Sequence, residues 1–148
     1  MKKIKIHRID DNNDYQISGI ICDKPDYWLA LNLNRSLQIN LVRTEDFPKY
    51  NPKTKSIAKF PFFHCSDEWE RKIYLLANKS RENILFPTYK HFDYFLLFEK
   101  FTSGIDDINN AVRQIPGITA CIPFPFESIP ENKYFAEDLE MHLLDVTE

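Results

Sequence analysis

The segment spanning residues 92–98, FDYFLLF, constrains the fold more than any other part of the chain. Successive side chains of a β-strand point to opposite faces, and every residue of this segment except Asp93 is apolar or aromatic. We therefore expect this strand at the centre of a sheet. The chain also carries twelve Phe and seven Tyr, residues that favour strands, so the sheet should have a Phe-rich core.

Two strand–helix–strand patterns stand on either side of a hairpin pattern. The first runs from a β-branched strand over residues 14–22, through a helix capped at Asp23 and ending near Leu37, to a strand over 39–44. The second joins the central strand to a helix over residues 104–114 and a strand over 118–124. Short joins of this kind are typical of parallel crossover units.

The part of the chain between these units predicts a polar loop followed by two neighbouring strands. The loop covers residues 45–56, which hold two prolines, and the strands cover residues 57–65 and 69–78. Pro61 lies inside the first of these strands and indicates a sheet edge or a bulge. On the second strand Trp69 belongs to the apolar face, so we expect its side chain in the core.

These elements together predict an α+β domain over residues 1–125. The expected architecture is a two-layer sandwich, in which a mixed, mostly antiparallel sheet has two helices on one face and ferredoxin-like β-α-β units. Residues 126–148 form an acidic amphipathic tail. Three arrangements of this tail stay open: docking on the domain's own sheet, docking on a partner, or fraying.

Composition excludes several classes of function. The net charge of −3 and the pI near 5.8 give no basic face for nucleic acid, and three glycines argue against a glycine-lined phosphate loop, so no cofactor is expected. Cys22, Cys65 and Cys121 are odd in number and lack zinc-site spacing, so we expect free thiols and no metal. Without a signal-peptide pattern or a long apolar run, we expect a cytoplasmic protein that makes no membrane contact.

Residues 84–95, ILFPTYKHFDYF, carry a family resemblance. Phe86-Pro87-Thr88 is followed after three residues by Phe92-Asp93-Tyr94, which resembles the segment that names the IPExxxVDY family of uncharacterised small bacterial proteins. The resemblance covers residues 1 to about 125 and implies a small cytosolic domain of unassigned function. In this chain Thr88 stands where the motif has Glu, Phe86 where it has Ile, and Phe92 where it has Val.

The motif residues are candidates for binding or for structure. A carboxylate at position 88 cannot act in this chain, which favours a structural motif in which Pro87 ends one segment. Asp93 should then accept backbone N–H groups in the preceding turn, and Tyr94 should find a partner for its hydroxyl. The alternative is acid–base chemistry by Asp93 with His91 or Tyr94, if the pair lines a cleft.

A second cluster, His64-Cys65-Ser66-Asp67-Glu68, has the residue types of a nucleophilic or metal site. Neighbouring residues of a strand point to opposite faces, so His64 and Cys65 should not form a hydrogen-bonded pair. A zinc site also needs three or four ligands. We therefore expect neither a catalytic nor a metal site in this cluster.

The sequence favours a non-enzymatic binding or interaction domain, with a homodimer or an unidentified protein as its partner. Trp28 lies off the main apolar stripe of its helix and is a candidate partner-facing residue. The alternative is a small-molecule sensor similar to ACT domains, although residues 22–25 lack the glycine-bearing loop usual there. A third hypothesis is a small enzyme that uses Asp93 and His91.

Overall fold

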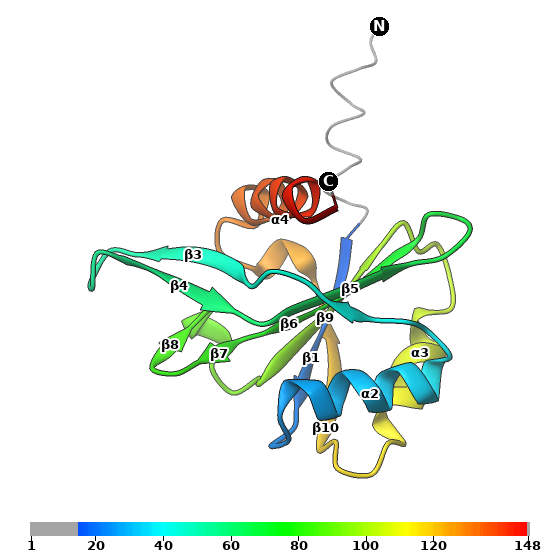
Figure 1. The fold of residues 1–148 in the computed structure, drawn as a ribbon. Helices are drawn as coiled ribbons and strands as arrows, with labels where there is room; N and C mark the ends of the chain where they lie inside the picture. The colour runs from blue at the N-terminus through cyan, green and yellow to red at the C-terminus, as the bar shows by residue number, and fades with distance from the viewer. Residues whose placement is uncertain (1–14, 148) are drawn as a thin grey trace, which may run out of the picture.

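The computed structural model describes residues 15–147, which form an α+β structure around a six-stranded sheet (Figure 1). The strand order in this sheet is β10-β1-β9-β6-β5-β2, and every pair of neighbours is antiparallel. Its strands are β1 (Tyr15–Ile21), β2 (Val42–Arg43), β5 (Phe62–Ser66), β6 (Lys72–Ala77), β9 (Tyr94–Glu99) and β10 (Ala120–Phe124). Two hairpins accompany it: β3 (Phe47–Asn51) with β4 (Ser56–Phe60), and β7 (Lys79–Ser80) with β8 (Asn83–Ile84).

Strand β9 lies between β1 and β6, which confirms that the FDYFLLF segment is central. Its side chains enter two separate cores. Phe95 and Leu97 belong to the core on one face of the sheet, and Leu96 and Phe98 belong to the core on the other. All four are fully buried, so neither face of β9 meets water.

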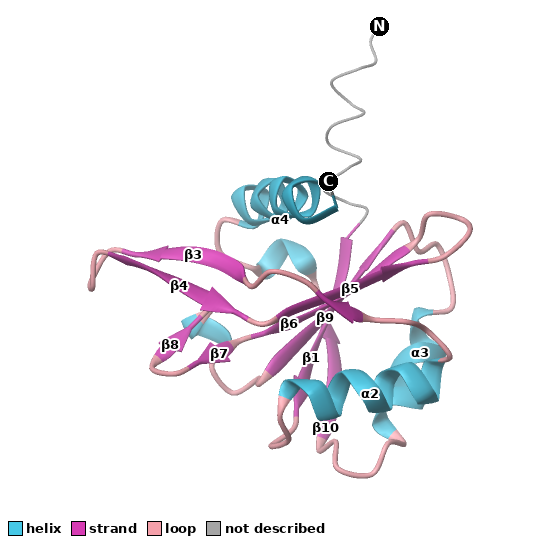
Figure 2. Ribbon diagram, in the orientation of Figure 1, coloured by secondary structure: helices cyan, strands magenta, loops and turns pink. Residues whose placement is uncertain are grey.

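Two helices cover one face of the sheet, as expected (Figure 2). They are α2 (Asp26–Leu37) and α3 (Ile105–Arg113). The apolar stripe of α2, which includes Leu29 and Leu33, packs into this core, and Val112 does so from α3. Helix α2 begins after Pro25 without a side-chain cap, so the cap expected at Asp23 is wrong.

The opposite face is covered as well, which corrects the expected two-layer sandwich. Helix α4 (Asn132–Thr147) and the short 3-10 helix η2 (Phe126–Ser128) lie over it (Figure 1). Of the arrangements open for the tail, docking on the chain's own sheet is the one observed. The docked side chains are Phe126, Ile129, Phe135, Ala136, Leu139 and Leu143.

The sheet also differs from the expected mixed pairing. The strand after α2 shrinks to β2, which pairs with β5 and is separated from β1 by three strands. Strand β1 instead lies between β9 and β10, the two strands that α3 connects. A strand–helix–strand pattern predicts that its two strands run in the same direction. It does not predict which strands are neighbours in the sheet, because that depends on all the strands that could pair at the same edge.

Residues 45–56, expected as a polar loop, form most of the β3–β4 hairpin. Phe47 and Phe60 are cross-strand partners, and both are buried. Pro61 interrupts the predicted strand over 57–65, so that β4 ends before it and β5 begins after it. Within residues 15–147, the helices are too short or too polar to cross a membrane.

Replacement of Leu139 by Ala tests the docking of α4. The Leu139 side chain is fully buried, so we expect Leu139→Ala to lower the free energy of unfolding by about 2–5 kcal/mol in urea titrations. Tyr134→Ala on the exposed side of the same helix is the control and should change stability by about 0.5 kcal/mol or less. Equal effects of the two substitutions would contradict the docking.

Candidate functional site

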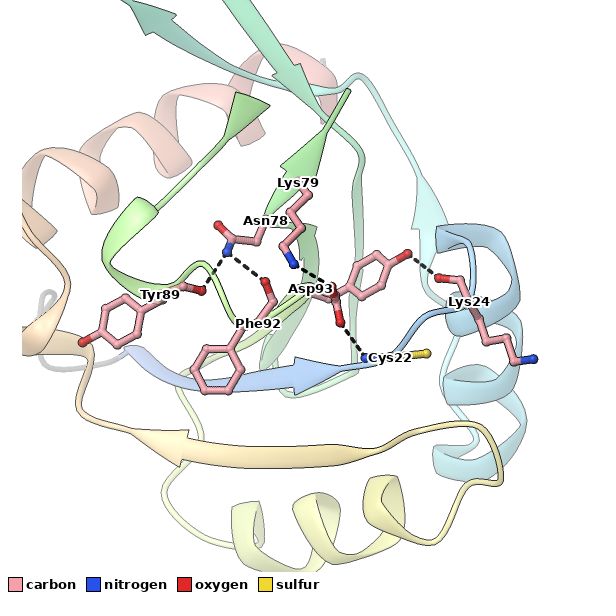
Figure 3. A network of polar contacts seen from close by, with 8 residues as sticks. Cys22, Lys24, Asn78, Lys79, Tyr89, Phe92 and Asp93 are labelled. Atoms are coloured by element: carbon pink, nitrogen blue, oxygen red, sulfur yellow. Dashed lines mark hydrogen bonds and ion pairs between the residues drawn. The ribbon is translucent and has the colours of Figure 1, made fainter. Parts of the chain in front are cut away.

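The motif segment, residues 84–95, leads into β9 next to the end of β6. Asn78, the residue that follows β6, makes the hydrogen bonds that hold this junction together (Figure 3). The Asn78 side chain is fully buried. Its Nδ2 donates to the carbonyl oxygens of Tyr89 at 3.0 Å and Phe92 at 2.9 Å, and its Oδ1 accepts from the Phe86 amide at 2.9 Å. One side chain therefore holds both ends of the connection that contains the short helix η1 (Pro87–Tyr89).

The backbone of Asn78 strengthens the same junction. Its N–H donates to the carbonyl of Asp93 at 3.0 Å, and its carbonyl accepts from the Leu85 amide at 2.7 Å. The side-chain and backbone bonds together pin residues 85–93 against the end of β6. This arrangement orders a loop, because each bond ends on the chain's own backbone.

Asp93 joins this junction to the end of β1. Its Oδ2 accepts from the backbone amide of Cys22 at 2.9 Å, and its Oδ1 lies 2.9 Å from the Lys79 ammonium. The sequence predicted backbone N–H partners in the preceding turn, and this prediction is wrong, because the amide that binds belongs to a residue 71 positions earlier. The ends of β1 and β9 meet in the sheet, where the Asp93 amide donates to the Ile20 carbonyl.

Tyr94 holds the connection between β1 and α2. Its hydroxyl donates to the carbonyl oxygen of Lys24 at 2.7 Å, which confirms that this hydroxyl finds a partner. Burial, with the charges of Asp26 and Asp93 nearby, raises the pKa of Tyr94 above its usual value. The phenol therefore stays protonated and acts as a donor. Its hydrogen bond fixes the position of the backbone at Lys24 from inside the fold.

His91 and Asp93 are not assembled into an acid–base pair. His91 is exposed, and its ring lies against Phe92 with centroids 4.2 Å apart. Among the hydrogen bonds of residues 15–147, none joins His91 to Asp93, whose two oxygens are held by Lys79 and Cys22. The geometry does not prepare this pair for proton transfer.

The two tryptophans exchange their expected environments. Trp28 is half-buried and packs at the edge of the α2–α3 core, where a Cβ at Gly117 would lie 2.6 Å from its Cη2 atom. Gly117 has a φ of +104°, a backbone conformation that favours glycine. Because glycine has no Cβ, the indole of Trp28 can pack directly on the turn after α3. Trp69, predicted to be in the core, is 67% exposed in the turn before β6.

His64 and Cys65 point to opposite faces of β5, as predicted. His64 packs on the α4 side, with its ring 6.2 Å from that of Phe62, and Cys65 packs against the α2–α3 core. His64 pairs with Tyr74 in the ladder, whereas Tyr94 pairs with Ala77 near the other end of β6. The fold therefore does not unite His64 with Asp93 and His91.

A groove of about 530 Å³, the α4 groove, lies between the sheet and the C-terminal half of α4. It is lined by His64, Ser66, Lys72, Glu99, Glu140, Leu143 and Leu144. The Tyr74 hydroxyl donates a hydrogen bond to Glu99, and burial lowers the pKa of His64, with Lys72 and His142 adding to the effect. The described residues include no cluster of three or more His, Cys, Asp or Glu able to hold a metal ion.

A second groove, the hairpin groove, lies between the β3–β4 hairpin and residues 82–87 and has a volume of about 380 Å³. Pro87 is one of the residues that line it. Two bonds join its walls: Asn51 Nδ2 donates to Asn83 Oδ1 at 3.0 Å, and Lys49 Nζ donates to the Leu85 carbonyl at 2.7 Å. Pro87 therefore lines the hairpin groove, whereas the side chains of Asp93 and Tyr94 make their hydrogen bonds within the fold.

Asn78 and the hairpin were not singled out from the sequence as a junction and a groove wall. A polar residue at the end of the apolar run KIYLLA was the available indication for Asn78. Comparisons with protein-family models, with curated proteins and with solved structures found no match. The functional inference therefore depends on the geometry of this chain.

Removal of the Asn78 side chain tests the junction. Asn78→Ala leaves three backbone groups of the η1 connection without their partner, so we expect a loss of about 2–4 kcal/mol in the free energy of unfolding, measured in urea. Asn40→Ala on an exposed loop is the matched control and should cost about 0.5 kcal/mol or less. If Asn78→Ala behaved like the control, the bonds to the loop would not hold the junction.

Proposed function

We propose that this chain is a non-enzymatic cytoplasmic binding domain that acts through protein–protein contact as a homodimer. The observation that supports this most is an exposed apolar pair on the β3–β4 hairpin. Tyr50 and Ile57 lie directly opposite each other in the hairpin register and are 59% and 60% exposed. Tyr is enriched at protein interfaces, where its ring buries a large area with little loss of side-chain freedom.

The hairpin has one packed face and one open face. Phe47, Ala58 and Phe60 are buried on the inner face, and Tyr50 and Ile57 belong to the other. The hairpin also projects beyond the main sheet (Figure 1). A projecting element with an exposed apolar pair near its tip can contact a partner without rearrangement of the core.

The edges of the main sheet are poor alternatives for a dimer contact. On β10, Pro123 has no N–H to donate, and the Arg113 Nε donates to the Cys121 carbonyl at 2.8 Å. At the other edge β2 has two residues. The apolar face that the tail covers is likewise used within the chain, which leaves the hairpin as the better supported contact.

We also propose that the sheet contains a ferredoxin-like core and that the chain is related to the cytoplasmic family that its motif resembles. The order β10-β1-β9-β6, with α3 joining β9 to β10 around β1, supports such a core if residues 42–66 are an insertion. Cys22, Cys65 and Cys121 are all free, which fits a reducing compartment. The convergence of Asp93 and Tyr94 on one junction supports the resemblance to the IPExxxVDY proteins as a structural one.

A small-molecule sensor of the ACT-like type is the second candidate. The hairpin groove, at about 380 Å³, is within the usual range for small-molecule sites, which supports this candidate. The loop between β1 and α2 argues against it. The Cys22 amide donates to Asp93, and the Tyr94 hydroxyl donates to the Lys24 carbonyl, so the backbone of this loop is fixed by the chain's own side chains.

A dilution series with light scattering tests the homodimer. We expect a concentration-dependent dimer, and we expect the double variant Tyr50→Ser, Ile57→Ser to weaken it at least about tenfold, because the apolar contact is lost. Tyr27→Ser is the matched control, since Tyr27 is 72% exposed on α2, outside the hairpin. A wild-type protein that stays monomeric at every concentration would refute the dimer.

Thermal-shift measurements with amino acids and nucleotides separate the two candidates. A sensor must be stabilised by its ligand, so its melting temperature should rise with ligand concentration. We expect no such rise if the chain acts through protein contact alone. A saturable rise that Pro87→Ala or Asn83→Ala weakens would favour the sensor and the hairpin groove.

A further inference from the structure

We propose that the chain has a binding site for a small apolar carboxylate, in which Arg71 binds the carboxylate and the margin of the α2–α3 core binds the apolar body. The site is a cavity of about 510 Å³, the Arg71 pocket, lined by the end of α2, the turn that joins β5 to β6, and α3. Its apolar residues belong to the core beneath α2 and α3, whereas the hairpin packs on the α4 side of the sheet. The inference therefore does not depend on the proposed homodimer.

The apolar wall of the Arg71 pocket is a gap in the cover of the α2–α3 core. Its members are Leu37, Ile39, Cys65, Ile73, Phe101 and Ile108. Ile73 and Phe101 are buried in this core, whereas the other four are half-buried at its margin. Among residues 15–147, Trp28 is the one other half-buried apolar residue packed at that margin. The core therefore exposes most of its apolar margin in this cavity, whose volume is typical of small-molecule sites.

Arg71 is held in a fixed orientation at this cavity. Its Nε donates to Asp67 Oδ2 at 2.7 Å, and its guanidinium carbon lies 4.8 Å from the ring centre of Phe101 and 5.2 Å from that of Trp69. A side chain that is already ordered loses little conformational freedom when a ligand binds. The bond to Asp67 uses Nε, so the two Nη groups carry further N–H donors, in a geometry that matches the two oxygens of a carboxylate.

Asp67 also lines the pocket, but its two oxygens are engaged by its own turn. Oδ1 accepts from the backbone amides of Trp69 and Arg71, both at 2.9 Å, and Oδ2 accepts from the Arg71 Nε. Asp67 therefore positions the guanidinium, and the Nη donors remain for a ligand. A charged acceptor binds such donors more strongly than a neutral one, and an ammonium would be repelled by Arg71. These contacts favour a carboxylate with an apolar body over an alcohol or an amine.

Titration of the nitrogen-15-labelled full chain with octanoate, octan-1-ol and octylamine, followed by the NMR shifts of backbone amides, tests this site. The three probes have the same apolar chain and differ in the charge of the head group. We expect octanoate to bind saturably and to shift the amides of residues 38–40 and 65–71. We also expect it to bind at least about tenfold more tightly than either of the other probes, because it alone pairs its charge with Arg71.

Two variants separate the charge from the apolar wall. Arg71→Gln should weaken octanoate binding at least about tenfold and leave octan-1-ol binding unchanged, because the alcohol does not use the guanidinium charge. Ile108→Glu should weaken the binding of both, because it puts a charged group into the apolar wall. Lys72→Gln is the matched control, since it removes the same charge from the next residue, which lines the α4 groove on the opposite face of the sheet. It should leave octanoate binding unchanged.

The comparison of the three probes uses the wild-type chain, so it decides the ligand class even if a variant fails to fold, which circular dichroism would show. Octan-1-ol or octylamine binding as tightly as octanoate would overturn the inference, as would equal losses in Arg71→Gln and Lys72→Gln. Shifts confined to residues 49–53 and 82–87 would place the probe in the hairpin groove and overturn the site. The absence of a saturable shift with octanoate would overturn the inference outright and leave the homodimer standing.

Discussion

Burial of β9 on both faces is the constraint on which the rest of the structure depends. Phe95 and Leu97 require cover on one side and Leu96 and Phe98 on the other, so a sheet with helices on one face would leave apolar side chains in water. Helix α4 with η2 covers Phe95 and Leu97, and helices α2 and α3 cover Leu96 and Phe98. The acidic tail is thereby drawn into the fold, and its amphipathic pattern has a partner within the chain.

The motif that carries the family resemblance takes part in hydrogen bonds that join segments far apart in the sequence. Asn78 holds the η1 connection, Asp93 holds the end of β1, and Tyr94 holds the start of the path into α2. The bonds of these side chains end on the chain's own backbone, apart from the pair between Asp93 and Lys79, and Thr88 takes no part in them. The contact surface that we propose therefore lies elsewhere, on the β3–β4 hairpin.

Much of the fold was predictable because it follows from local periodicity. The apolar spacing of α2 and α3, the alternation along β6 and the continuous run of β9 all report burial directly. The hairpin over residues 47–60 was not predicted, because the Lys and Pro residues between Phe47 and Phe60 give the segment the polar composition of a loop, although both aromatic residues are buried. The candidate site fared similarly: the hydroxyl partner of Tyr94 was expected, but the amide bound by Asp93 was not.

The sequence by itself determined the class of the fold, the central strand, the two helices beneath it and the opposite orientations of His64 and Cys65. These follow from the periods of helix and strand, which act over a few residues. Only the tertiary structure decided the neighbour of each strand, the docking of α4 and the role of Asn78. These depend on contacts between residues far apart in the chain, where several arrangements bury similar apolar area and the competition between them selects one.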